Sequence, residues 1–127
     1  MHSKRFQYRI GDSFSQSVNL KTDAGAAYDL TGATLWYVVK ENEDDADEDA
    51  KLWLYWEDGG TADGIAVADA LSGTAQVSRT AVQMNDAAFL PGVYFWFLRL
   101  KVASSAIYSP DVGILDVLPG ITAITPP

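Results

Sequence analysis

The sequence predicts an all-β fold, namely an antiparallel β-sandwich of about eight strands in a single domain, residues 1–127. Apolar and polar residues alternate with a period of two along most of the chain, which is the pattern of half-buried strands. Turn-forming residues interrupt this alternation at regular intervals. No interval leaves room for the crossover helices of a parallel sheet, so antiparallel pairing is expected throughout.

The first strand shows the pattern clearly, because Phe6, Tyr8 and Ile10 alternate with polar neighbours and Gly11-Asp12 ends the run. Eight or nine short strands are predicted in all, over residues 6–10, 14–20, 34–40, 52–56, 65–68, 74–79, 93–102, 107–108 and 112–118. This number and spacing favour a β-sandwich of immunoglobulin-like topology, with a small barrel as the alternative.

One short helical turn is expected near residues 80–90. Thr80 is a suitable N-cap, and Pro91-Gly92 ends the segment. The last nine residues, 119–127, contain three prolines, and the sequence leaves open whether they form an extended tail or a frayed end.

Composition narrows the possible partners. The 127 residues suffice for one core, and the absence of cysteine excludes disulfides and thiolate chemistry. A net charge of −8 disfavours nucleic acid and anionic membranes as partners. Neither a signal peptide nor an apolar span long enough to cross a bilayer is predicted.

Aromatic residues occur on both faces of several predicted strands. In strand 93–102, Tyr94, Trp96 and Leu98 form one face, while Phe95 and Phe97 lie on the other. Strand 52–56 repeats the feature, because Trp53 and Tyr55 oppose Leu52, Leu54 and Trp56. Trp53, Tyr55, Phe95 and Phe97 are therefore candidates for a protein interface. The alternative is that loops cover these four side chains within the monomer.

Catalytic and metal chemistry find little support. The only histidine is His2, near the start of the chain, so a nucleophile–histidine–acid set is not expected. The acidic run 41–49 lacks the glycine and spacing of an EF-hand loop, and we interpret it as a solvated hairpin loop rather than a calcium site. No enzymatic activity, cofactor, metal or small-molecule substrate is predicted.

Five short motifs occur in a characteristic order. They are Gly11-Asp12-Ser13-Phe14, Asp29-Leu30-Thr31-Gly32-Ala33, Gly73-Thr74-Ala75-Gln76-Val77, Leu90-Pro91-Gly92-Val93-Tyr94 and Gly113-Ile114-Leu115-Asp116-Val117. The series resembles the immunoglobulin-like domain of phage and prophage structural proteins, in particular the N-terminal domain of siphophage upper baseplate proteins. The resemblance covers roughly residues 7–122 and carries no catalytic residues.

This resemblance implies a non-enzymatic virion structural protein of the tail, baseplate or neck, made in the host cytoplasm and assembled through protein–protein contact. The expected partners are other virion proteins or further copies of this chain, in a possible homo-oligomer. The alternative is a module that binds carbohydrate or another surface ligand, since the segment Trp53-Leu54-Tyr55-Trp56 could stack on sugar rings.

Overall fold

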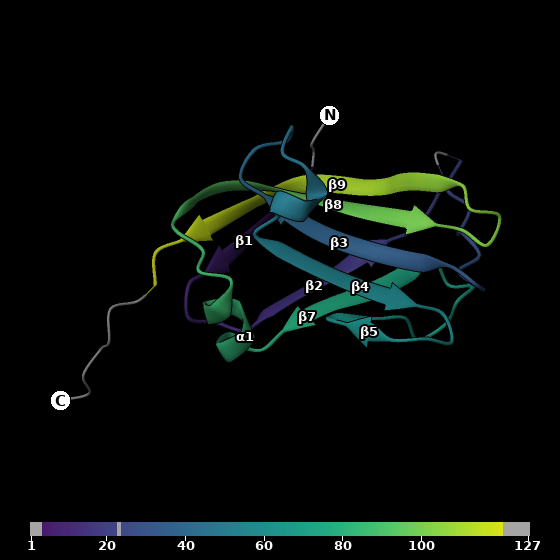
Figure 1. Ribbon diagram of the computed structural model, residues 1–127, viewed down its shortest axis with the longest axis horizontal. Helices are drawn as coiled ribbons and strands as arrows, with labels where there is room; N and C mark the ends of the chain where they lie inside the picture. Colours follow the sequence, from purple (N-terminus) through teal and green to yellow (C-terminus); the bar gives the residue numbers. More distant parts are fainter. Residues whose placement is uncertain (1–3, 23, 121–127) are drawn as a thin grey trace.

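A computed structural model describes residues 4–22 and 24–120, so His2 and most of the predicted tail lie outside the described residues. Nine strands, one α-helix and one 3-10 turn follow one another (Figure 1). Their bounds are β1 Arg5–Arg9, β2 Phe14–Asn19, β3 Thr34–Lys40, η1 Asp47–Asp49, β4 Leu52–Glu57, β5 Ala62–Asp63, β6 Ile65–Ala66, β7 Thr74–Arg79, α1 Ala81–Asp86, β8 Gly92–Lys101 and β9 Ile107–Leu118.

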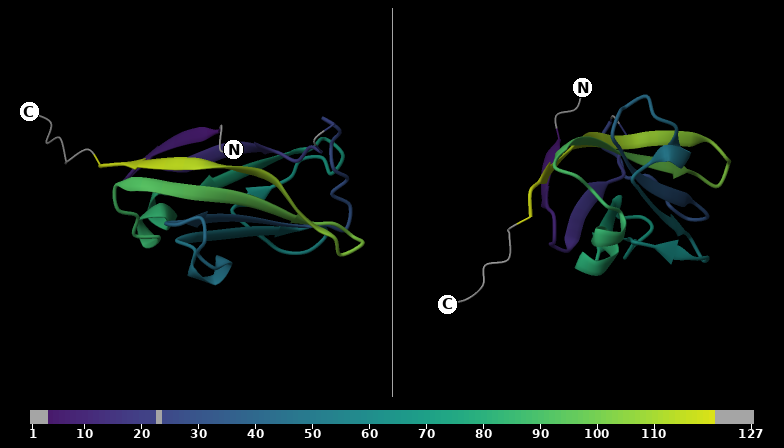
Figure 2. Two further views of the ribbon diagram at one scale, coloured as in Figure 1. Left: turned by 90° about the horizontal axis from the view of Figure 1, so that it is seen from above. Right: turned by 60° about the vertical axis from the view of Figure 1, so that its left-hand side comes forward.

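The strands form two sheets that pack face to face (Figure 2). The larger sheet has the order β1-β9-β8-β3-β4-β5, and the smaller one has the order β2-β7-β6. The protein is an all-β sandwich. The strand orders β9-β8-β3-β4-β5 and β2-β7-β6 are those of the variable type of the immunoglobulin fold, except that β1 lies beside β9 and not beside β2. The predicted fold class is therefore confirmed.

The pairing of β1 with β9 is parallel, which corrects the expectation that every pair is antiparallel. The expectation was that no connection between successive strands is long enough for a parallel pair. It does not apply to β1 and β9, because almost the whole domain lies between them in the sequence. Side chains reinforce the pairing: Lys4 Nζ lies 2.8 Å from the Asp111 carboxylate, and Arg5 Nη2 lies 2.8 Å from that of Asp116. The six other strand pairs are antiparallel, as expected.

Strand β9 is continuous, although the sequence predicted two strands separated by Ser109-Pro110-Asp111. Its register with β8 shifts between Leu98 and Leu100, which is a bulge. Proline is tolerated at such an irregularity because no ladder hydrogen bond is required of its nitrogen. The short strand β5 was not predicted either.

The helical segment was predicted at the right place and with the right N-cap, but α1 ends at Asp86, before Pro91-Gly92, and the backbone turns away at Ala88, whose φ is 54°. Thr80 caps α1, with its hydroxyl oxygen accepting from the Gln83 amide while the Gln83 side chain accepts from the Thr80 amide. Met84 points into the core from this helix. In Figure 1, α1 lies at one end of the sandwich, beyond β2 and β7.

Aromatic rings join the two sheets in the core. Trp96 of β8 stacks on Tyr37 of β3 with centroids 5.8 Å apart, and Tyr37 contacts Phe14 of β2 at 6.2 Å. Tyr37 also donates its hydroxyl proton to Gln16 Oε1 across the sandwich, at 2.8 Å. In antibody domains a disulfide and a tryptophan fill this region. Stacked rings occupy it here, in a chain without cysteine.

The end of the sandwich near α1 carries a tyrosine corner. Tyr94 donates its hydroxyl proton to the Leu90 carbonyl at 2.9 Å and accepts from the Leu90 amide at 3.2 Å. In immunoglobulin-like sandwiches, a tyrosine corner lies where the chain enters the strand that corresponds to β8. It gives a physical reason for the Leu-x-Gly-x-Tyr motif found in the sequence.

Candidate functional site: the outer face of the larger sheet

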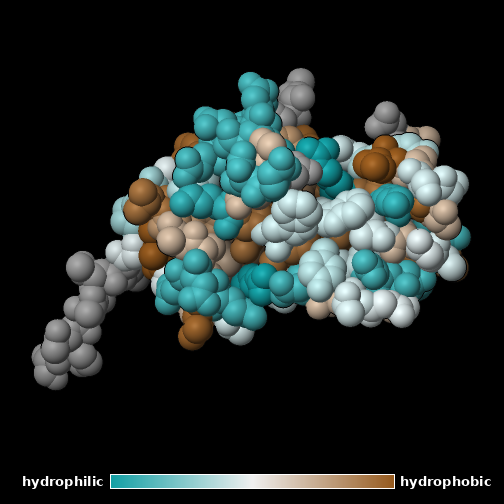
Figure 3. Space-filling view, in the orientation of Figure 1, coloured by the Kyte–Doolittle hydropathy of each residue, from teal (hydrophilic) through white to brown (hydrophobic). Residues whose placement is uncertain are grey.

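The outer face of the larger sheet carries the densest group of aromatic side chains outside the core. Outward residues on four neighbouring strands form what we call the aromatic face: Trp36, Val38, Trp53, Tyr55, Phe95, Phe97, Arg99, Ile107 and Val112. Pale aromatic side chains lie in the middle of the surface shown in Figure 3, below a strongly hydrophilic cluster.

Strand register determines the neighbours on this face. Trp36 of β3 lies between Tyr55 of β4 and Arg99 of β8. One rung further along, Val38 lies between Trp53 and Phe97. Side chains directly opposite each other across strands have Cβ atoms about 4.5–5.5 Å apart, so each rung is a continuous contact row.

All four residues predicted as an interface, Trp53, Tyr55, Phe95 and Phe97, lie on this face. Trp53 is 44% exposed, and the other three are partly buried. The structure therefore brings the predicted residues together. Their role as an interface remains a prediction.

The acidic loop between β3 and β4 covers one end of the face. Lys40, only 3% exposed, donates from Nζ to the Asp45 carbonyl at 2.8 Å. The same Nζ lies 5.0 Å from the centroid of the Phe97 ring. Lys40 therefore fastens the loop at Asp45, close to Phe97 of β8. The acidic side chains Glu41, Glu43, Asp44, Glu48 and Asp49 are exposed, as expected for a solvated loop. Figure 1 shows η1 above β3, on the side away from β2 and β7.

A hollow of about 250 Å³ opens at the other, uncovered end of the face. Trp36, Trp53, Arg99 and Ile107 line it. Small-molecule sites usually measure about 300–1,000 Å³, so this hollow is closer in size to a protruding side chain of a partner. The Arg99 guanidinium lies 5.7 Å from the Phe97 ring centroid, which places a positive charge at its wall.

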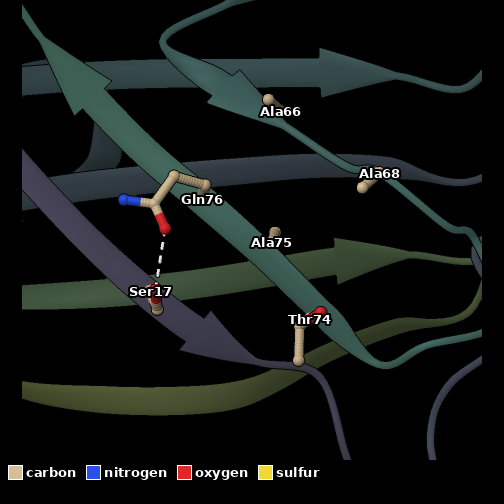
Figure 4. Close-up of a pocket in the computed structure, with 6 residues that line it drawn as sticks. All are labelled: Ser17, Ala66, Ala68, Thr74, Ala75 and Gln76. Carbon is tan, nitrogen blue, oxygen red and sulfur yellow. Dashed lines mark hydrogen bonds between the residues drawn. The ribbon is translucent and has the colours of Figure 1, made fainter.

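Two further hollows offer less chemistry. The one in Figure 4, about 300 Å³, lies over β6 and β7 of the smaller sheet, and none of its six lining residues is charged. Ser17 donates to Gln76 Oε1 across it at 2.7 Å. The other, about 320 Å³, contains Arg79, whose two terminal nitrogens bind the Asp63 carboxylate at 2.8 and 3.0 Å.

Titratable groups with shifted pKa values are structural and lie away from the aromatic face. Burial in the core raises the pKa of the Tyr37 hydroxyl well above its usual value, and the negative charge of Asp111 adds to the effect. Burial also raises the pKa of Tyr8. Hydrogen bonds from the Thr31 side chain and amide lower the pKa of Asp29, at the turn that enters β3.

Within residues 4–22 and 24–120, no group of three or more histidine or acidic side chains is placed to hold a metal ion. No helix in that part is long and apolar enough to span a membrane.

Comparison with known proteins identifies no family for this chain. No protein-family model matches the chain, and neither does any curated protein. A solved structure of murine CRIg is similar over 91% of this chain and 91% of its own, with a TM-score of 0.45 and 10% identity. The fold assignment given above rests on strand order within the two sheets.

Sequence reasoning overlooked part of the aromatic face. Trp36 was not among the predicted interface residues, and the sequence did not indicate that Trp36 and Trp53 line one hollow with Ile107. That association depends on the register of β3 with β4 and on the bulge in β9, neither of which alternation specifies. Arg99 was visible as the basic continuation of the Phe95, Phe97 stripe.

Proposed function

We propose that this protein is a non-enzymatic structural component of a phage or prophage virion, in the tail, baseplate or neck. It assembles by protein–protein contact through the aromatic face. The observation that carries the proposal is the partly exposed aromatic row on the larger sheet, with Trp53 beside a hollow of side-chain size. Aromatic residues and arginine are the side chains enriched at the centre of protein interfaces.

The order of the five sequence motifs resembles that of phage and prophage structural proteins, and this resemblance is the reason for proposing a virion. Two motifs have structural roles in the sandwich: Leu90 to Tyr94 forms the tyrosine corner, and Asp29 caps the turn before β3 by accepting from the Thr31 amide at 2.9 Å. The motifs therefore support the fold, and the aromatic face supports assembly. Proteins that assemble by contact need no catalytic group.

Virion association tests the proposal directly. Particles assembled in the presence of the wild-type protein are purified by density gradient. Mass spectrometry then measures whether the particles contain this protein. We expect stoichiometric recovery of wild type and loss of Trp53→Lys, with Val82→Lys as the matched control. Val82 is 72% exposed on α1, so the same charge is added far from the aromatic face. Absence of the wild-type protein from intact particles would overturn the proposal.

A carbohydrate or surface-ligand module is the second candidate, because two indoles line the hollow. Tryptophan rings stack on sugar faces, and binding would change the fluorescence of Trp36 or Trp53. A glycan array with hits that disappear in Trp53→Ala would support this function. No hits and unchanged fluorescence would eliminate it.

A further inference from the structure

We infer that the partner seated on the aromatic face is a second copy of this chain, packed face to face with its strands antiparallel to those of the first. The inference rests on the proposed function, because it names the partner for the same surface. Three observations carry it: the apolar and aromatic side chains along the face, the distribution of charge along the strands, and the position in which Lys40 holds the acidic loop.

Exposed apolar side chains lie along this face. Three of the seven large apolar residues that are exposed in the described part of the chain, Trp53, Val93 and Ile107, lie on the outer side of the larger sheet, whereas the other four, Leu71, Val82, Leu90 and Tyr108, lie elsewhere. Val93 lies at the loop end, and Trp53 and Ile107 flank the hollow. An apolar surface that spans four strands is the kind that a self-associating protein covers.

Charge is distributed unevenly along the strand direction. At the Lys40 end of β3, the loop carries carboxylates at Glu41, Glu43, Asp44, Asp45, Glu48 and Asp49. At the Thr34 end, β8 presents Arg99 and then Lys101, which pairs with Thr34. Glu57 also reaches that end, but on the β4 side of Thr34, away from β8.

The position of the acidic loop decides which relative orientation of the two copies is favourable. Lys40 binds the loop at the Asp45 carbonyl, and its Nζ lies over the Phe97 ring of β8. Parallel stacking would place the two acidic loops together, which like charges disfavour. In the antiparallel arrangement, the two-fold axis that relates the copies runs across the strands of the sheet. As a result, β8 of one copy lies over β8 of the other. Each acidic loop then meets Arg99 and Lys101 of the other copy, and the contact occurs twice.

Light scattering after size exclusion, over a wide concentration range, measures the pairing. Wild type should approach twice the 13.8 kDa of one chain. Trp53→Lys should raise the dissociation constant at least about 30-fold, as loss of a central interface residue does, while Val82→Lys leaves it unchanged. A wild-type monomer at every concentration overturns the inference, and so does a dimer indifferent to Trp53→Lys.

Charge reversal tests the antiparallel arrangement. Because the net charge of −8 makes two copies repel at long range, salt dependence would mix two effects. Arg99→Glu with Lys101→Glu should weaken the dimer at least tenfold, and adding Asp44→Lys with Glu48→Lys should restore it, since both signs are then exchanged. Circular dichroism confirms that each variant folds. Weakening without rescue would overturn the antiparallel arrangement.

The two proposals fail separately. A strict monomer that is still recovered from particles overturns the second copy as partner and leaves the virion role intact. A dimer that is absent from particles overturns the virion role and leaves the second copy as partner intact.

Discussion

At the scale of single residues, Gly113 shows how close the packing around Trp96 is. A Cβ atom at Gly113 would lie 2.5 Å from Trp96 Nε1, and the indole is fully buried. Gly113→Ala should therefore destabilise the fold by at least about 1–3 kcal/mol, the usual cost of overpacking. Chemical denaturation of wild type and Gly113→Ala measures this loss of stability.

The double variant Gly113→Ala with Trp96→Phe is the control for that prediction. The smaller ring relieves the contact, so the two changes should cost less together than the sum of their separate effects. Additive costs would show that Gly113 is required for another reason.

Because of Tyr37, the stability of the fold depends on pH in the alkaline range. Because burial raises the pKa of its hydroxyl in the folded state, its contribution is complete below the unfolded pKa of about 10 and is lost as pH rises above that value. Tyr37→Phe should lower stability near neutral pH by about 1–3 kcal/mol, since Gln16 Oε1 loses its donor. It should also reduce the fall in stability above pH 10.

Urea denaturation at several pH values separates the two effects of Tyr37→Phe. Gln16→Leu combined with Tyr37→Phe should recover part of the neutral-pH loss, because neither polar group is then left unpaired. Equal alkaline sensitivity in wild type and Tyr37→Phe would contradict the assignment, with Tyr8 as the next candidate.

At the scale of elements, Lys40 connects the acidic loop to the larger sheet. Lys40→Met keeps an unbranched apolar side chain, one atom shorter, but removes the donor to the Asp45 carbonyl and the charge over Phe97. Hydrogen exchange at residues 41–50 should become faster, with a much smaller change at β8. Lys51→Met is the matched control, because its ion pair with Glu41 is longer, at 3.6 Å, and more exposed. Equal effects of the two variants would contradict the role given to Lys40.

The elements also show how far sequence reasoning reaches. Alternation in β8 and β4 correctly separated Tyr94, Trp96 and Leu98 from Phe95 and Phe97, because burial on one face imposes a period of two. Alternation carries no information about which strand lies beside which. The parallel neighbour of β1 and the hollow shared by Trp36, Trp53 and Ile107 both depend on long-range register, and local sequence does not encode it.

At the scale of the whole molecule, one aromatic core joins both sheets. Phe14, Tyr37 and Trp96 lie in contact across the sandwich, so neither sheet has a core of its own. Unfolding should therefore be a single cooperative transition, in which tryptophan fluorescence and far-ultraviolet circular dichroism coincide. Two separated transitions would show that the sheets are independent.

The parallel pairing of β1 with β9 has a mechanical consequence. Since the two strands run in the same direction, the chain that precedes β1 and the chain that follows β9 leave the pair in opposite directions along the strands. Tension applied through those two segments would load the hydrogen bonds between β1 and β9 in shear, all together, instead of opening them one by one. The ion pairs of Lys4 with Asp111 and of Arg5 with Asp116 lie along the same seam and would share that load.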